Sequence, residues 1–376
     1  LLGRAEALLG ESAAGELLLE LGNALAKHGE LRRAEETFGR AGESSDRRLQ
    51  LRAKIELQTL RSFAVPEGAA EDNARVAEEA IPELERLGDD YGLAKAWRLL
   101  SEAHVIASRW QARADALERA LAHARRVPEA RRDASTIAML LAQALHYGPT
   151  PAPAAIARCR ELLRDAEADE GLRAGVTATL AALVAMQGDL EQARGLYAES
   201  TALLDELGLR FRRAVRSLVG AEIESLAGDL PAAERELRRG YETLEAIGER
   251  GVRAVLAAFL GDVLCQRGDD DEAERFAGIA ADLVEAADLV PHALEHAVRA
   301  RVLSRRGDET AEALARHAVE LAARSDFPDL RARTLLALAE VVPDEADEHV
   351  AEARRLYEQK GNLVAADSLR ARPAVS

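Results

Sequence analysis

The run His292-Ala-Leu-Glu-His296 has residue types and spacing that match a zinc site. It fits the His-x-x-Glu-His pattern, in which two histidines on one helix face hold Zn²⁺ and the glutamate, here Glu295, acts as general base. A zinc site of this kind also needs a third ligand and an open cleft. Because the run lies in the first turn after Pro291, inside an ordinary repeat helix, we interpret both histidines as surface residues. A zinc hydrolase stays as a remote alternative.

Nucleotide-binding loops are missing from the sequence. Neither Gly-x-x-x-x-Gly-Lys-Ser/Thr nor Gly-x-Gly-x-x-Gly occurs, so the backbone cradle that these loops provide for phosphates is not encoded here. We therefore expect no bound cofactor, no catalytic residues and no ATP hydrolysis by this chain. Any ATPase or cyclase activity is expected to lie outside it.

Charge and cysteine content restrict the partners and the compartment. The net charge of −16 repels phosphates, which argues against nucleic acid and anionic lipid surfaces as partners. Cys159 and Cys265 are far apart and suggest no disulfide framework, which fits a reducing cytoplasm. No uncharged apolar run is long enough to span a bilayer, so we expect a cytoplasmic protein without membrane spans.

A turn signal of glycine followed by an acidic residue recurs along the chain. It occurs at Gly188, Gly228, Gly268 and Gly307, at an almost constant spacing, and again at Gly29. Extending the period in both directions predicts further helix breaks near residues 68, 108, 148 and 343. Each unit reads as helix, tight turn and helix, because glycine adopts the left-handed conformation after a helix and the acidic residue favours the next N-terminus.

The second helix of four units repeats a three-residue pattern on one face, five, nine and twelve residues after the glycine. Small residues at the first and third places allow neighbouring helices to approach closely, and the middle residue, large in three of the four units, fills the space between them. The four triplets are Ala34/Phe38/Ala41, Ala193/Tyr197/Ser200, Ala233/Leu237/Gly240 and Ala273/Ala277/Ala280. Aromatic residues make up only 3%, so alanine and leucine must provide most of the packing, which favours helices over strands.

These triplets resemble the tetratricopeptide consensus, at a period longer than its usual ~34 residues. Several runs are also similar to bacterial signalling ATPases of the STAND type, in which such arrays follow an AAA-type or NACHT-like ATPase, often with an adenylate/guanylate cyclase or transcription-regulator module. The runs are His146–Cys159, Trp97–Leu100, Ala185–Gly188, Ala233–Arg238 and Leu356–Asn362. The resemblance implies an all-α solenoid, a right-handed superhelix of about nine repeats of ~40 residues each. We expect residues 1–376 to form one repeat array, a fragment of a longer multidomain protein.

The repeat also predicts a partner-binding set. In a tetratricopeptide unit, the residue six before the turn glycine faces the groove of the superhelix, and this position carries charge at Glu102, Glu222, Asp262 and Arg301. Lys95 and Arg98 lie seven and four residues before Glu102 and extend the same face. We expect these six residues to line the groove and to pair with a charged peptide or a polar effector. A groove that is merely solvated is the simpler alternative.

The leading hypothesis is a non-catalytic sensor or protein-interaction region. It would regulate the catalytic or DNA-binding part of a signalling ATPase by binding a protein or peptide, another domain of the same protein, or another copy. The alternative is a receptor lobe that holds a small-molecule effector in the groove. A long polar surface would favour the first, and a closed pocket with convergent polar groups the second.

Overall fold

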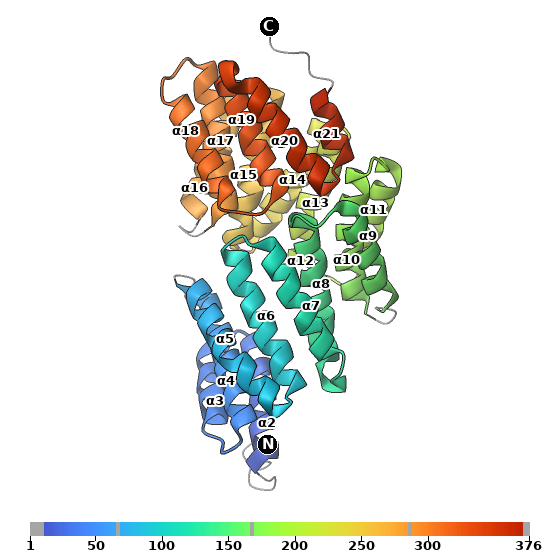
Figure 1. Ribbon diagram of the computed structural model, residues 1–376, viewed down its shortest axis with the longest axis vertical. Helices are drawn as coiled ribbons and strands as arrows, with labels where there is room; N and C mark the ends of the chain where they lie inside the picture. The colour runs from blue at the N-terminus through green and yellow to red at the C-terminus, as the bar shows by residue number, and fades with distance from the viewer. Residues whose placement is uncertain (1–10, 65–67, 166–168, 285–287, 371–376) are drawn as a thin grey trace. The chain divides into compact units, whose positions relative to one another are not determined.

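The computed structural model describes residues 11–64, 68–165, 169–284 and 288–370, of which 85% are helical and none forms a strand (Figure 1). This confirms the expected all-α fold of tetratricopeptide-like hairpins. None of the described helices is long and apolar enough to cross a membrane. The helices are α2 (Glu11–Lys27), α3 (Leu31–Gly42), α4 (Arg47–Ala64), α5 (Ala69–Leu87), α6 (Asp90–Ile106), α7 (Trp110–Ala124), α8 (Arg131–Tyr147), α9 (Ala152–Arg164), α10 (Glu170–Met186), α11 (Leu190–Glu206), α12 (Arg210–Val215), α13 (Ser217–Leu226), α14 (Leu230–Ala246), α15 (Gly251–Arg267), α16 (Asp270–Leu283), α17 (Leu289–Arg305), α18 (Ala311–Ala323), α19 (Pro328–Val341), α20 (Ala346–Lys360) and α21 (Leu363–Arg370), with short 3₁₀ turns at Pro128–Ala130 and Pro343–Glu345.

The chain forms two compact units. Unit 1 comprises Leu1–Ile106 and Ala112–Ile137, and unit 2 comprises Ala107–Gln111 and Ala138–Ser376. Within each unit, helices that are consecutive in the chain pack as hairpins, for example α5 with α6 in unit 1 and α15 with α16 in unit 2.

Every predicted break separates a first helix from a second helix. Gly29, Gly68, Gly188, Gly228, Gly268 and Gly307 all have positive φ, as expected for left-handed turn residues. Ser108 stands at a predicted break that lacks glycine and still adopts φ 52°. The other two breaks use different devices: the turn at Gly148–Pro151 precedes α9, and a 3₁₀ turn starts at Pro343.

The second helices pack through their small residues, as the triplets predict. Ala34, Phe38 and Ala41 are all buried in α3, and Ala273, Ala277 and Ala280 are all buried in α16. In α14, a Cβ on Gly240 would lie 2.7 Å from the Ser217 Cβ atom and 2.8 Å from the Ala214 carbonyl oxygen. Glycine at this position is what allows α14 to approach α12 and α13 so closely.

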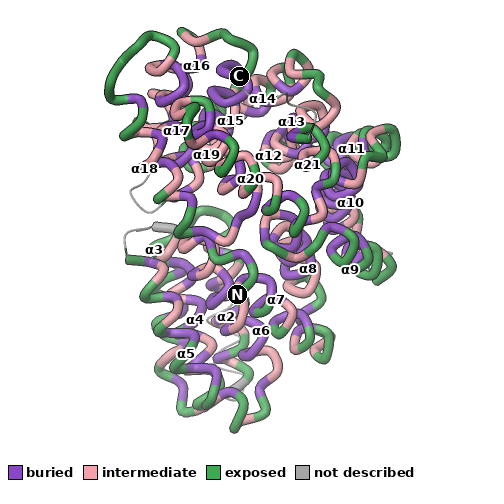
Figure 2. The backbone as a smooth tube through the Cα atoms, turned by 45° about the horizontal axis from the view of Figure 1, so that its top comes forward, coloured by how far each residue is buried: buried purple, intermediate pink, exposed green. Residues whose placement is uncertain are grey.

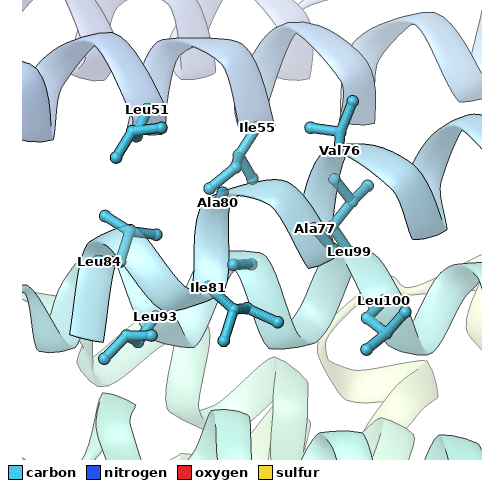
Figure 3. Packing of buried hydrophobic residues seen from close by; sticks show 11 residues of the cluster. Leu51, Ile55, Val76, Ala77, Ala80, Ile81, Leu84, Leu93, Leu99 and Leu100 are labelled. Atoms are coloured by element: carbon cyan, nitrogen blue, oxygen red, sulfur yellow. The ribbon is translucent and has the colours of Figure 1, made fainter. Parts of the chain in front are cut away.

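Leucine and alanine form the core of unit 1 (Figure 3). Leu51 and Ile55 of α4 meet a row of small and branched residues on α5, including Ala77, Ala80 and Leu84. Leu93, Leu99 and Leu100 of α6 cover the other side of the same row. Because the apolar residues of α5 recur every three or four positions, one continuous face serves both neighbouring helices.

Unit 2 contains a helix that is buried all round. All residues of α10 from Ala174 to Met186 are buried, whereas α14 and α16 each bury one face. In Figure 2, exposed residues concentrate at the turns and on the outer sides of the helices. A helix that is apolar on every side indicates an interior position with neighbours on several faces.

Candidate functional site

The main polar feature of unit 2 is a set of buried ion pairs that joins its first helices. Asp262 of α15 accepts hydrogen bonds from Arg301 Nη1 of α17 and from Arg333 Nη1 of α19, both at 2.7 Å. Arg301 Nε also lies 3.1 Å from a carboxylate oxygen of Glu340. Asp262 and Arg301 are only 2% and 6% exposed. One carboxylate thus holds three successive first helices together.

Electrostatics keep the Asp262 carboxylate ionised. Burial alone would raise its pKa, but the guanidinium groups of Arg333 and Arg301 outweigh burial, so the pKa lies below the ordinary value. Arg333 also donates from Nε to Asp329 Oδ2 at 2.6 Å. The charges in this group are therefore matched within the protein.

A second buried pair joins α8 to α13. His146 Nε2 lies 3.0 Å from a carboxylate oxygen of Glu222, and His146 is buried. Burial opposes ionisation of Glu222, yet His146, followed by Arg333 and Lys360, lowers the pKa of this carboxyl group. Glu222 keeps one fifth of its side-chain surface exposed, so it is the most accessible group of this pair.

Lys360, the last residue of α20, fixes the end of α8. Its Nζ donates to the carbonyl oxygens of Leu145, Gly148 and Thr150, each at 2.8 Å. These carbonyls lie at the end of a helix and in the following turn, where the backbone has no helical partner. Burial lowers the pKa of Lys360 to about 7, although Glu222 opposes this change.

Further contacts within unit 2 join segments that are far apart in sequence. The Asp326 carboxylate accepts from the backbone N–H groups of Trp110 (2.6 Å) and Gln111 (2.9 Å), and Ser325 Oγ donates to the Ser108 carbonyl oxygen at 3.0 Å. The ring centroids of Trp110 and Tyr147 lie 5.0 Å apart. At the C-terminal end of the described residues, α21 contacts α10. Unit 2 therefore connects its late repeats directly to its early ones.

Unit 1 has a buried ion pair of the same type. Lys95 Nζ of α6 donates to Glu56 Oε1 of α4, and lies 3.6 Å from Asp133. Asn23 Nδ2 donates to the same glutamate oxygen at 3.2 Å. Burial acts against the charge of Lys95, but Glu56 more than compensates, so the pKa of this lysine is raised.

The six predicted groove residues differ in burial: three are buried and three are partly exposed. Lys95, Asp262 and Arg301 are buried and ion-paired, which corrects the expectation that they line an open groove. The repeat spacing itself explains this result. Residues one period apart fall at equivalent places on consecutive first helices, so opposite charges at this spacing neutralise each other. Glu222 is paired with His146 yet partly exposed.

Arg98 and Glu102 are the two members that stay half-exposed without an ion pair to any described residue. Partner binding by the predicted set stays a prediction. The predicted set did not include Glu56, His146, Arg333 and Lys360. Glu56 could have been predicted, because it lies one repeat period before Lys95 in the sequence. No feature of the sequence around Lys360 indicates its role.

The His292/Glu295/His296 run lies on α17, within a repeat helix as expected. Glu295 is buried, and its Oε1 atom lies 2.5 Å from His296 Nδ1, which raises the pKa of that histidine. His296 also packs its ring against His317, with centroids 5.0 Å apart. Within the described ranges, no group of three or more His, Cys, Asp or Glu side chains is arranged to hold a metal ion.

Comparisons with known proteins concern the fold. No protein-family model and no curated protein matches the sequence. Among solved structures, a Rap protein complexed with Competence and Sporulation Factor superposes with a TM-score of 0.66 at 12% identity, covering 96% of this chain and 99% of that one. The apo form of RapI superposes with a TM-score of 0.49 at 12% identity, covering 96% of this chain and 99% of that one. A STAND protein with a tetratricopeptide repeat sensor from Pyrococcus horikoshii superposes with a TM-score of 0.45 at 13% identity, covering 80% of this chain and 50% of that one. The chain thus shares the helical-repeat fold of the Rap protein over 96% of its length.

Proposed function

We propose that this chain is a non-catalytic regulatory scaffold that binds a protein or peptide partner. The observation that carries the proposal is the end-to-end likeness to a Rap protein that was solved in complex with Competence and Sporulation Factor. The buried ion pairs fit this role, because they fix the spacing of the first helices before any partner arrives. A preorganised surface loses less conformational entropy on binding.

The finer part of the proposal rests on the sequence resemblance. We propose that the regulated activity belongs to a bacterial signalling ATPase of the STAND type, encoded beside this repeat region and working in the cytoplasm. Partner binding would change the restraint that the repeats place on that activity. The complete reading frame of the gene tests this part directly.

Selection from a random-peptide display library on the purified chain tests the binding function. We expect related peptides to be enriched and to bind the wild-type chain in a fluorescence anisotropy titration. The double variant Arg98→Gln/Glu102→Gln should weaken binding at least tenfold, because these half-exposed groups lie on the predicted binding face. The control Glu71→Gln/Arg160→Gln makes the same charge changes at exposed positions of two second helices and should leave the affinity unchanged.

Three results would contradict the proposal. If the selection yields no family of related peptides, a peptide partner is excluded. Stabilisation of the chain only by small metabolites in a thermal-shift screen would favour the effector lobe instead. Hydrolysis of ATP or peptides by the purified chain, lost on His296→Ala, would restore the zinc hydrolase.

A further inference from the structure

Two half-buried arginines in unit 2 form no ion pair with any residue that the structure describes. Arg212 lies in α12, and Arg216 lies four residues later, at the break between α12 and α13. No carboxylate of the described residues lies within ion-pair distance of either side chain. Their neighbour Arg213 is different, because it donates to the Tyr197 hydroxyl at 3.4 Å and lies 3.8 Å from Asp205.

A pair of glycines on α10 makes room for the two guanidinium groups. Arg212 Nη1 lies 3.5 Å from where a Cβ of Gly171 would be, and Arg216 Nη2 lies 3.5 Å from the corresponding point at Gly175. The two glycines are one helical turn apart, as are the two arginines, so the pairs face each other in register. The nearby Asp169 uses Oδ1 to accept the Leu172 N–H at 2.9 Å, which caps the start of α10.

Folding alone does not account for this arrangement. Like charges four residues apart on a helix repel each other. Burial lowers the pKa of Arg216, and Arg212 contributes in the same direction, while the Tyr147 and Tyr197 hydroxyl groups act against it. A desolvated charge without a partner costs free energy that a well-packed apolar side chain would not. The pair therefore resembles a binding feature, for which a protein gives up some stability.

We propose that Arg212 and Arg216 form a binding site for a carboxylate group of an acidic peptide segment. Guanidinium groups bind carboxylates through paired N–H donors, and two of them side by side present several such donors. The strongly negative net charge of the chain repels every polyanion, but a short peptide segment carries far fewer charges than nucleic acid, so it meets a smaller repulsion for the same guanidinium–carboxylate contact. This inference rests on the proposed peptide-binding function and names the chemistry of one contact.

Fluorescently labelled hexaglutamate and hexaglutamine peptides test the site by anisotropy at physiological salt. Both peptides are N-acylated by the label and C-amidated, so that only side-chain carboxylates differ. We expect hexaglutamate to bind and hexaglutamine to bind at least tenfold more weakly. The third peptide tested is hexaglutamine with a free C-terminal carboxylate. Binding of this peptide would show that a terminal carboxylate also occupies the site.

The variants Arg216→Met and Arg212→Gln should each weaken hexaglutamate binding at least tenfold. The exposed Arg210→Gln removes the same charge nearby and should change the affinity less than twofold. The midpoint of urea unfolding should stay equal or rise in Arg216→Met, because the unpaired charge is gone. A purely structural arginine would instead lower this midpoint.

Equal binding of the two amidated peptides, unchanged affinity in Arg216→Met, or a lowered unfolding midpoint in that variant would overturn the site. Absence of hexaglutamate binding would also overturn it. The peptide selection described above judges the scaffold function independently of these outcomes, so the two proposals fail separately.

Discussion

At the scale of single residues, two groups of buried charges are matched internally. Asp262 is shared by Arg301 and Arg333, and Lys95 is shared by Glu56 and Asp133. Replacing such a group by apolar residues can be neutral, but removing one member leaves the others buried and uncompensated. Each group therefore acts as a unit, and single substitutions within it should be costly.

Asp262→Asn is expected to lower the free energy of unfolding by about 3–5 kcal/mol, because it leaves two arginines without their common carboxylate. Urea denaturation followed by circular dichroism measures this loss. The control is Asp271→Asn, since Asp271 pairs with Arg306 at 2.8 Å but is fully exposed. Its effect should be far smaller, because solvent and salt screen an exposed pair. Equal effects of the two substitutions would show that the Asp262 group does not stabilise the fold.

The lowered pKa of Lys360 predicts a pH-dependent stability. Its pKa falls from 10.5, the ordinary value, to about 7 on folding, so the unfolded chain binds more protons between these two values. Stability relative to the Lys360→Met variant should therefore rise from about pH 7 to about pH 10.5, by at most about 1.4 kcal/mol per pH unit. Urea unfolding of both proteins at several pH values measures the difference. A difference that is flat across this range would show that Lys360 keeps its ordinary pKa.

At the scale of helices, close approach depends on particular glycines. Gly240→Ala should destabilise the protein by about 1–3 kcal/mol, because the new Cβ meets the Ser217 side chain and the Ala214 backbone carbonyl. Gly195→Ala on α11 is the matched control, since nothing lies within 4 Å of its added Cβ. It should stabilise by about 0.5–1 kcal/mol through helix propensity. Thermal unfolding compares the two, and stabilisation by both would mean that α14 can move away from α12 and α13 at little cost.

The sequence predicted the helices better than their contacts. Glycine and acidic residues at a regular period located the breaks, since turn conformation is a local property that only a few residue types satisfy. Even the break at Ser108 followed from the period alone. The interruption between α12 and α13 at Arg216 had no such signal. Pairing of charges across first helices was also missed, because the period places equivalent positions side by side but does not say which charges are satisfied.

At the scale of the molecule, contacts of high sequence separation distinguish unit 2 from a simple stack of repeats. In a stack, each repeat contacts its neighbours only. Here Lys360 binds the carbonyls at the end of α8, and Asp326 binds the first two amides of α7. Periodicity describes neighbours, so no pattern in the sequence could have predicted these connections.

The connection through Asp326 can be tested by amide hydrogen exchange. Asp326→Ala removes the acceptor of the Trp110 and Gln111 N–H groups, so peptides that cover these two amides should exchange faster, although the substitution lies in a distant part of the chain. Asp308→Ala is the control, because Asp308 accepts the N–H of Thr310 at 2.8 Å only two positions further on. Its effect should stay within the turn before α18. A full-length chain in which Asp326→Ala changes exchange only near residue 326 would show that the late repeats of unit 2 do not hold the early ones, and the first repeats of the unit would then have to be ordered by their immediate neighbours alone.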